Sequence, residues 1–466
     1  MEHYQIAIIG AGPGGYETAI RLNQFNISVI CIEKERIGGV CLNKGCIPTK
    51  SLVKVADLYS DIKNAEDYGI KTNETSIDYQ SVINRKNQVV EKLVSGIEFL
   101  FNKRNIPLLK KNITKIKKTD GKYFIYSSDE LLCSSNYIII ATGSKPKELP
   151  FLPFDNDKIL SSDHILNLNE LPKNITIIGG GVIGCEFACI FAQFGVSVSI
   201  VEFLPEIVPT EDEEISKRLN ISLKKMGIKI FTKTSVESGI INDSEIELSL
   251  SNGKMLTSEK VLVSVGRNPV FDITTEGFEI NKTRDFIEID EYCQTNEQNV
   301  FAIGDITGKL MLAHTASKQG LLVADYINKA INNTEMSLFP LNYENIPACI
   351  FTNPEVSSCG LTEKQARQKY EKIKTGKFPY AANGKALSSG AINGFVKTII
   401  NEETNEILGI HIIGYTATEL IAQASILLSM KSKVEDVSNI IFAHPTISEC
   451  MMESIEDTHS MAIHLI

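Results

Sequence analysis

Two cysteines lie five residues apart in a glycine-rich segment, residues 38–50. Cys41 and Cys46 are close enough along the chain to form a small disulfide that an incoming thiol could reduce. Pro48 suits the first turn of a helix, so we expect Cys46 at a helix N-terminus, where the helix dipole stabilises a thiolate. A metal site would need two further ligands, and no second Cys or His pair supplies them at a matching spacing. The pair therefore predicts a redox-active dithiol.

A histidine near the C-terminus precedes a glutamate by five positions. At this spacing the carboxylate of Glu449 could orient the imidazole of His444 for acid–base work. On its own, such a pair is more typical of a surface histidine beside a helix-start acid. Together with the dithiol and the two nucleotide motifs below, it is better interpreted as an acid–base pair.

Two segments of the chain, residues 4–33 and 175–202, repeat one pattern. Each has an apolar strand, a glycine turn, a helical stretch and a second strand that ends in an acid, Glu33 or Glu202. In both copies the acid lies 23 positions after the first glycine. This is the dinucleotide-binding fingerprint, in which backbone N–H groups at a helix N-terminus face a pyrophosphate and the acid faces the ribose. Two such sites suggest one flavin and one nicotinamide.

The remaining pattern fits two doubly wound units followed by a different domain. Further strands end at residues 142–144, 266–267 and 304–305, and a long amphipathic helix is expected within residues 78–104. Prolines at 146, 150 and 153 indicate a linker. Beyond about residue 341, strands and helices alternate in a way that predicts a separate α+β domain.

Composition excludes several classes of protein. The 466 residues carry a net charge of −10, so neither nucleic acid nor a membrane surface is expected as a partner. No apolar run approaches the ~20 residues of a membrane helix. The first residues run directly into a strand, so we expect no signal or transit peptide. Ten cysteines without a disulfide-scaffold pattern favour the cytoplasm.

Taken together, the motifs resemble those of the pyridine nucleotide–disulfide oxidoreductases, and within them the dihydrolipoamide dehydrogenase family. The resemblance covers nearly all of the chain. Its most specific motifs are residues 38–50, 179–186, 302–305, 311–314 and 444–449. It implies an α/β fold with two Rossmann-like dinucleotide-binding units, for FAD and NAD, plus a C-terminal α+β dimerisation domain. The implied domains are an FAD-binding domain in two parts (1–147 and 271–340), an NAD-binding domain (148–270) and a dimerisation domain (341–466).

The resemblance also implies roles for single residues. The first glycine turn would hold FAD, because the redox cysteines follow it and must face the isoalloxazine. The FAD contacts that it implies are Gly10, Gly12, Gly14, Gly15, Glu33, Lys50, Thr114, Gly143, Asp305 and Ala313. The NAD contacts are Gly179, Gly180, Gly181, Val182, Ile183, Gly184, Glu186, Glu202 and Gly266. The catalytic residues are Cys41, Cys46, His444, Glu449, Lys50 and Glu186, with Lys50 beside the flavin N5 and paired with Glu186.

The implied reaction oxidises dihydrolipoamide. The substrate attacks the disulfide at Cys41 while His444 takes its proton, and Cys46 is released as a thiolate against the flavin. The electron pair then passes through FAD to NAD⁺. The family forms homodimers in which the histidine comes from the other subunit. Its partners are lipoyl-bearing proteins, namely the dihydrolipoyl acyltransferase subunit of 2-oxoacid dehydrogenase complexes and the lipoyl protein of the glycine cleavage system.

Two alternatives remain open at this point. A glutathione-type or mercuric reductase would use NADPH, but no basic residue follows Glu202 until Lys217, and a carboxylate repels a 2′-phosphate. Mercuric reductases also carry a C-terminal cysteine pair, which this sequence lacks. A non-catalytic structural subunit of a multienzyme complex would have no need for the dithiol together with the histidine–glutamate pair. Lys44 and Cys450 depart from the family pattern, and we interpret them as a solvated loop charge and a packed thiol.

Overall fold

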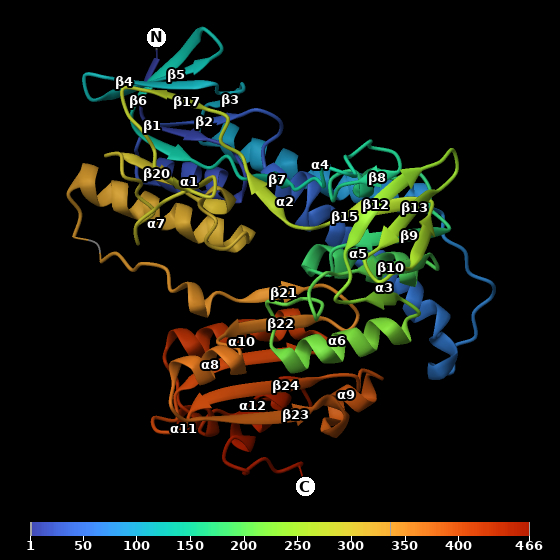
Figure 1. Ribbon diagram of the computed structural model, residues 1–466. Coiled ribbons are helices and arrows are strands. Elements are labelled where there is room, and N and C mark those ends of the chain that lie inside the picture. The colour runs from blue at the N-terminus through green and yellow to red at the C-terminus, as the bar shows by residue number, and fades with distance from the viewer. Residues whose placement is uncertain (1, 336, 466) are drawn as a thin grey trace. The chain divides into compact units, whose positions relative to one another are not determined.

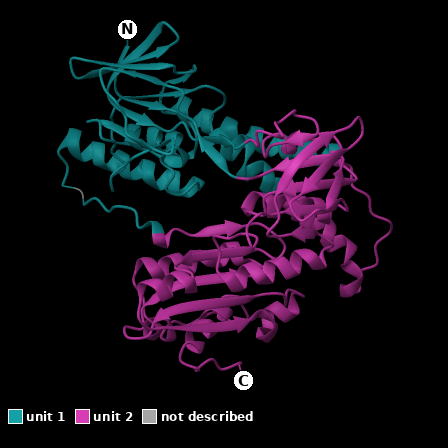
Figure 2. Ribbon diagram, in the orientation of Figure 1, with its two compact units in different colours: residues 1–51, 80–147, 266–343 teal, residues 52–79, 148–265, 344–466 magenta. Residues whose placement is uncertain are grey.

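The chain forms two compact units, which Figure 2 distinguishes by colour. The computed structural model describes residues 2–335 and 337–465, so that Met1, Met336 and Ile466 lie outside the described part. Unit 1 consists of residues 1–51, 80–147 and 266–343. Unit 2 consists of residues 52–79, 148–265 and 344–466. Each unit therefore brings together segments that are far apart in the sequence.

An eight-stranded sheet forms the centre of unit 1 (Figure 1). Its order is β17-β4-β5-β6-β1-β2-β3, and β20 also pairs with β6. Strands β20, β6, β1, β2 and β3 are parallel, whereas β4, β5 and β6 form an antiparallel meander. The strands are β1 (Glu2–Ile9), β2 (Val29–Glu33), β3 (Leu108–Lys110), β4 (Lys115–Thr119), β5 (Lys122–Ser127), β6 (Glu130–Ile140), β17 (Thr274–Glu276) and β20 (Val300–Ala302).

Helices and short strands complete unit 1. The helices are α1 (Pro13–Gln24), α2 (Gly39–Lys44), the start of α3 (Cys46–Lys63), α4 (Tyr79–Lys103), η3 (Gly304–Thr307) and α7 (Ala313–Asn332). Two small ribbons pair β7 (Ser144–Pro146) with β16 (Arg267–Pro269), and β18 (Lys282–Thr283) with β19 (Phe286–Ile287). Helices α1 and α7 pack against each other (Figure 1).

The alternation of side chains along β1 explains how this sheet buries both faces. Ile6 and Ile8 belong to one core, with Leu22 of α1. Ala7 and Ile9 belong to a second core, which includes residues of β4 and β5. At β1 the sheet is therefore apolar on both faces.

Unit 2 contains a second parallel sheet, with strand order β11-β10-β9-β15-β8. Its strands are β8 (Ile159–Leu160), β9 (Asn174–Ile178), β10 (Ser197–Val201), β11 (Lys229–Phe231) and β15 (Lys260–Val263). The accompanying elements are η1 (Ala65–Tyr68), η2 (Ile165–Asn167), α5 (Val182–Gln193), α6 (Glu213–Lys225) and the antiparallel strands β12 (Val236–Ile241), β13 (Ile246–Leu250) and β14 (Met255–Ser258). Most of α5 is buried, which fits its almost continuous apolar sequence.

The C-terminal part of unit 2 is an antiparallel sheet with helices. The strand order is β21-β22-β25-β24-β23. The strands are β21 (Ala348–Ile350), β22 (Val356–Gly360), β23 (Ile373–Pro379), β24 (Phe395–Asn401) and β25 (Ile407–Ile413). The helices are η4 (Tyr343–Asn345), α8 (Glu363–Lys369), η5 (Tyr380–Ala382), α9 (Gly384–Ser388), α10 (Ala417–Ser429), α11 (Val434–Ser438) and α12 (Glu449–Asp457).

This architecture confirms the predicted fold class. A mixed sheet in unit 1 and a parallel sheet in unit 2 each carry a strand–glycine turn–helix motif between parallel strands, and an antiparallel α+β part follows them. Among the described residues, no helix combines the length and the apolar character that crossing a bilayer requires.

Candidate functional site

The first glycine turn connects β1 to α1. A Cβ on Gly10 would lie 2.2 Å from the carbonyl oxygen of Ala141, and one on Gly15 would lie 1.9 Å from that of Gly10, so close backbone packing explains both glycines. A Cβ on Gly12 would meet nothing nearer than the Cα of Gly39, at 3.9 Å. Gly12 is the N-cap of α1, and no side chain caps the helix. The turn therefore leaves room for a ligand in front of the uncapped N–H groups.

Glu33 ends β2 beside this turn. Its Oε2 accepts from the N–H of Ala11 at 2.7 Å, and its Oε1 accepts from the N–H of Glu35 at 2.9 Å. The carboxylate thus fastens the glycine turn to the end of the neighbouring strand. A contact between Glu33 and a ribose stays a prediction.

The end of β6 adds polar groups that the sequence analysis did not assign. The Oγ1 of Thr142 is buried and has no hydrogen-bond partner among the described residues. Gly143 follows with φ of +70°, and open space surrounds the position of its absent Cβ. Ser144 donates its hydroxyl to Asp305, the second residue of η3, and accepts from Nε of Arg267 at 2.7 Å. The open Gly12 cradle and the unpartnered hydroxyl fit a bound FAD.

The other predicted FAD contacts are distributed over unit 1. Ala313 is the first residue of α7. Gly14 lies against the same helix, where a Cβ would be 3.0 Å from a backbone oxygen of α7. Thr114 precedes β4, and both of its backbone groups are engaged, the N–H with Tyr126 at 3.0 Å and the carbonyl with Thr274 at 2.8 Å. Helix packing therefore explains Gly14, while the contact predicted for Thr114 has no free N–H to use.

The two cysteines lie together at the junction of two helices. Cys41 belongs to α2, and Cys46 is the first residue of α3, as its expected place at a helix N-terminus requires. Both side chains are thiols in this structure. A hydrogen bond to Cys46 and burial raise the pKa of the Cys41 thiol, while the ammonium of Lys50 opposes the rise. Cys41 therefore keeps its proton and donates it in a hydrogen bond to the sulfur of Cys46.

The two departures from the family pattern have ordinary structural roles. Lys44 forms an ion pair with Glu35 at the surface. Cys450 is fully buried in the core of the C-terminal part, and burial raises the pKa of its thiol to about 12. The interpretation of Cys450 as a packed thiol is confirmed, and Lys44 is a surface charge as interpreted, but it ends helix α2 rather than lying in a loop.

The second glycine turn, in unit 2, connects β9 to α5. A Cβ on Gly184 would lie 2.0 Å from the carbonyl oxygen of Gly179, whereas open space surrounds that position at Gly181, the N-cap of α5. Glu202 is 5% exposed, and its Oε2 accepts from the N–H of Gly180 at 2.6 Å. Its Oε1 accepts from the N–H of Leu204 at 2.7 Å. The turn thus repeats the first one: the glycine at the helix N-cap, Gly181, is open like Gly12, and the carboxylate of Glu202 accepts from a backbone N–H of the turn.

Four further predicted NAD contacts can be placed. Val182 and Ile183 form the first turn of α5. Glu186, one turn further along α5, is 4% exposed, and its Oε1 accepts from the N–H of Phe351 at 2.9 Å. Gly266 is the first residue of the segment that returns to unit 1, and its carbonyl accepts from Lys147. The pairing of Glu186 with Lys50 and the NAD contact of Gly266 stay predictions.

The histidine–glutamate pair lies at the start of α12. Nδ1 of His444 is 2.8 Å from Oε1 of Glu449, and Oε2 of Glu449 accepts from the N–H of Thr446 at 2.8 Å. Burial raises the pKa of Glu449, but the Thr446 N–H and the His444 imidazole outweigh it, so the pKa lies below its usual range. The His444 side chain is 78% exposed. An ionised carboxylate thus orients an imidazole whose other nitrogen faces outward.

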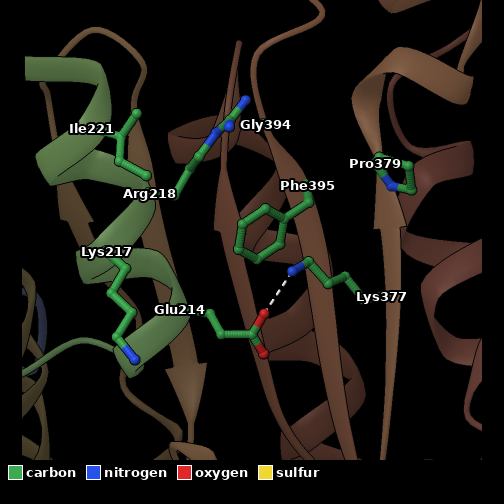
Figure 3. Close-up of a pocket in the computed structure, with 8 residues that line it drawn as sticks. All are labelled: Glu214, Lys217, Arg218, Ile221, Lys377, Pro379, Gly394 and Phe395. Carbon is green, nitrogen blue, oxygen red and sulfur yellow. Dashed lines mark hydrogen bonds and ion pairs between the residues drawn. The ribbon is translucent and has the colours of Figure 1, made fainter. Parts of the chain in front are cut away.

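Of two surface pockets formed by described residues, neither is lined by these side chains. One pocket, of about 360 Å³, lies between α6 and the strands β23 and β24 (Figure 3). It is lined by Glu214, Lys217, Arg218, Ile221, Lys377, Pro379, Gly394 and Phe395. Within residues 2–335 and 337–465, no group of three or more His, Cys, Asp or Glu side chains could hold a metal ion.

Comparison with known proteins identifies relatives along the whole chain. Residues 4–320 match the family described as pyridine nucleotide-disulphide oxidoreductase, and residues 346–455 match the dimerisation domain of that family. A dihydrolipoyl dehydrogenase from Zymomonas mobilis is 37% identical over 474 residues, which cover 99% of each chain. One from Bacillus subtilis is 37% identical over 481 residues, again 99% of each chain.

Solved structures show the same fold. LpdA from Mycobacterium tuberculosis superposes with a TM-score of 0.88 at 21% identity, covering 98% of this chain and 99% of the other. The HOCl-induced flavoprotein disulfide reductase RclA from Escherichia coli superposes with a TM-score of 0.84 at 26% identity, covering 97% and 99%. Members of the matched family use FAD and NAD, as the sequence motifs predicted. The chain therefore belongs to the pyridine nucleotide–disulphide oxidoreductases.

Proposed function

We propose that this enzyme oxidises protein-bound dihydrolipoamide to lipoamide and reduces NAD⁺ to NADH. The observation that carries the proposal is the combination, on one chain, of a hydrogen-bonded dithiol with an oriented histidine–glutamate pair. Relatives named dihydrolipoyl dehydrogenase match the chain from end to end, which supports the choice of substrate.

Each residue of the dithiol has a separate task. One sulfur of dihydrolipoamide attacks Sγ of Cys41 in the disulfide form, and Cys46 leaves as a thiolate. The second lipoyl sulfur then attacks its partner in the mixed disulfide, which releases lipoamide and the Cys41 thiol. FAD, held at the Gly12 turn, would supply the two-electron redox chemistry that connects the dithiol to NAD⁺. Lys50 contributes a positive charge close to the sulfurs.

His444 supplies the proton acceptor for the attacking thiol. Glu449 holds Nδ1, so Nε2 is left to take the proton. The lowered pKa of Glu449 keeps its carboxylate ionised, and this favours the imidazolium that forms.

The protein acts as a homodimer in this proposal, and His444 serves the dithiol of the partner subunit. Four apolar side chains near the chain's C-terminal end are exposed, as expected for a surface that a partner covers: Ile440, Ile441, Met461 and Ile463. The presence of the family's dimerisation domain supports the same arrangement.

The physiological partners are lipoyl-bearing proteins of 2-oxoacid dehydrogenase complexes, of the glycine cleavage system, or of both. We further propose a cytoplasmic location, because the ten cysteines of the sequence show no disulfide-scaffold pattern, which suits a reducing compartment. NADPH-dependent reduction of glutathione or mercury is disfavoured by the carboxylate of Glu202 at the end of β10.

A steady-state assay tests the proposal directly. The purified protein should carry about one FAD per chain and reduce NAD⁺ with dihydrolipoamide as electron donor. Purified lipoyl domains from each candidate complex should then be compared in the same assay, and their rates of NAD⁺ reduction rank them as substrates. A flavoprotein that oxidised NADPH with glutathione disulfide, and ignored dihydrolipoamide, would contradict the proposal.

A further inference from the structure

One lysine of the C-terminal sheet is buried among three carboxylates. Lys397, on β24, has a side chain that is only 2% exposed. Its Nζ lies 2.9 Å from Oδ1 of Asp212, 2.9 Å from Oε1 of Glu214 and 2.7 Å from Oε2 of Glu363. Burying an ammonium is costly unless its partners are close and well oriented. Here burial lowers the pKa of Lys397, but the three carboxylates outweigh it and hold the pKa above its usual range.

The carboxylates tie Lys397 to the beginnings of two helices. Asp212 is the N-cap of α6, where its Oδ1 accepts from the N–H of Glu214 at 3.1 Å. Its Oδ2 accepts from the N–H of Glu363, the first residue of α8, at 3.1 Å. Glu214 is shared as well, because its second oxygen bonds the ammonium of Lys377 (Figure 3). The start of α6 is therefore fixed to the C-terminal sheet by charges rather than by apolar packing alone.

The loop before α6 leads from this cluster to the second glycine turn. The N–H of Glu211 donates to the carbonyl of Val208 at 3.0 Å, and the N–H of Val208 donates to the carbonyl of Gly180 at 2.8 Å. Ser216, in α6, donates its hydroxyl to the carbonyl of Ile207 at 2.7 Å. Gly180 in turn donates to Glu202. A continuous set of hydrogen bonds thus connects the N-cap of α6 to the carboxylate at the proposed ribose site.

Two features show that this loop is held in place by its surroundings. Val208 has φ of +41°, a conformation that costs a β-branched residue free energy and persists only when neighbouring contacts impose it. Ile207 is fully buried, and its Cγ2 lies 2.9 Å from the position that a Cβ on Gly180 would take. If the start of α6 moved, the contacts that hold the loop in this shape against the glycine turn would be lost.

We infer that Lys397 is a positioning residue for the nucleotide site. By fixing Asp212 and the first turn of α6, it holds residues 203–212 against Gly180 in the shape that receives the adenosine half of NAD. The inference rests on the proposed NAD site at Gly179–Gly184 and Glu202. Lys397 touches neither the nucleotide nor the reacting atoms, and its effect passes through the loop.

The test uses the FAD-loaded full-length protein with two variants. Lys397→Met removes the ammonium and leaves three carboxylates without it, while Asp212→Asn removes one carboxylate partner of Lys397 and is the milder change for folding, because asparagine is also a good N-cap. Binding is measured by calorimetric titration with ADP-ribose, which carries the adenosine half without the nicotinamide. Amide hydrogen exchange of residues 203–212 is measured in the absence of nucleotide. Lys374→Met is the matched control, because Lys374, on the neighbouring strand β23, pairs with Glu402 at 3.4 Å and the two side chains are 41% and 39% exposed.

The expected result is selective. Both variants should bind ADP-ribose about tenfold more weakly, raise KM for NAD⁺ by a similar factor and exchange residues 203–212 faster, while FAD content and the rate of the dihydrolipoamide half-reaction stay within about twofold. The control should match the unmodified protein. If Lys397→Met does not fold, Asp212→Asn decides the question alone.

Two outcomes would overturn the inference. One is a folded variant with unchanged ADP-ribose affinity and unchanged exchange. The other is an equal loss in FAD content and in every kinetic step, which a purely structural role would produce. Failure of the proposed function is distinguishable from both, because then the unmodified protein would itself fail to bind ADP-ribose or to reduce NAD⁺.

Discussion

A buried glutamate next to the Lys397 cluster should make the stability of this protein depend on pH. Glu211 is 8% exposed, and its Oε2 has no hydrogen-bond partner among the described residues. Burial and the neighbouring Asp212 carboxylate raise the pKa of Glu211 to about 7, although a hydrogen bond with Ser358 opposes the rise. The folded protein therefore holds this proton at a pH where the unfolded chain has already released it.

The sign and the size of the effect follow from linkage. Below pH 4.5, the ordinary pKa of a glutamate, Glu211 is protonated in both the folded and the unfolded state, so its ionisation does not change the free energy of unfolding. Between pH 4.5 and about 7 the unfolded state alone ionises, so the free energy of unfolding falls as the pH rises. A difference of about 2.5 pKa units corresponds to about 3 kcal/mol, all of it lost above pH 7.

Glu211→Gln should abolish this loss, because the amide keeps the shape of the side chain and cannot ionise. Thermal unfolding of the FAD-loaded protein should show the variant more stable than the unmodified protein at pH 8 and nearly equal to it at pH 4.5. Glu371→Gln, a substitution at an exposed position of the same unit, should change neither value. Equal melting temperatures of Glu211→Gln and unmodified protein at pH 8 would refute the reasoning, as would a gain that is the same at both pH values.

Three other predictions concern the proposed chemistry. Glu202 should favour NAD⁺ over NADP⁺ by roughly two to three orders of magnitude in kcat/KM, about 3–4 kcal/mol, and a neutral replacement should narrow the ratio. After two-electron reduction a long-wavelength charge-transfer band should appear. Cys41→Ser should show this band without reductant, and Cys46→Ser should never show it. Identical spectra of the two variants would show that the assigned order of the two cysteines is wrong. His444→Gln should slow the dihydrolipoamide half-reaction by ~10²–10⁴-fold and leave FAD reduction by NADH unchanged, with a milder effect for Glu449→Gln. Verified heterodimers of a cysteine-free chain and a chain lacking His444 should regain activity at one site of two; heterodimers that stay inactive would argue against action across the interface.

The sequence predicts well those elements and contacts that are determined by residues close to one another along the chain. Pro48 predicted the start of α3 at Cys46, and apolar spacing predicted a helix within residues 78–104, where the structure has α4 at Tyr79–Lys103. The spacing between His444 and Glu449 predicted a contact that the structure contains. In each case the interacting groups lie within one or two turns of one another, so their relation is visible in the sequence.

The charge cluster could not be predicted in this way. Lys397 lies in an apolar run that the sequence identifies only as a strand, and its partners Asp212 and Glu363 are 185 and 34 positions away. The same holds for Ser144, which joins Arg267 and Asp305 from distant segments of unit 1. No periodicity of a single element reports such contacts, because they depend on how sheets and helices are assembled.

The repeated spacing of 23 positions has a structural cause that is independent of any ligand. In both copies the acid accepts from the N–H of the residue after the first glycine, at 2.7 Å from Ala11 to Glu33 and at 2.6 Å from Gly180 to Glu202. The helix and strand between the glycine and the acid must therefore have the lengths that bring the carboxylate back to the glycine turn, whether or not a ribose is bound. This is why the fingerprint identifies the turn so dependably and says so little about which dinucleotide occupies it. That information comes from outside the repeat, from Cys41 and Cys46 in the glycine-rich segment after the first turn, whereas Cys185 and Cys189 after the second turn are buried within α5.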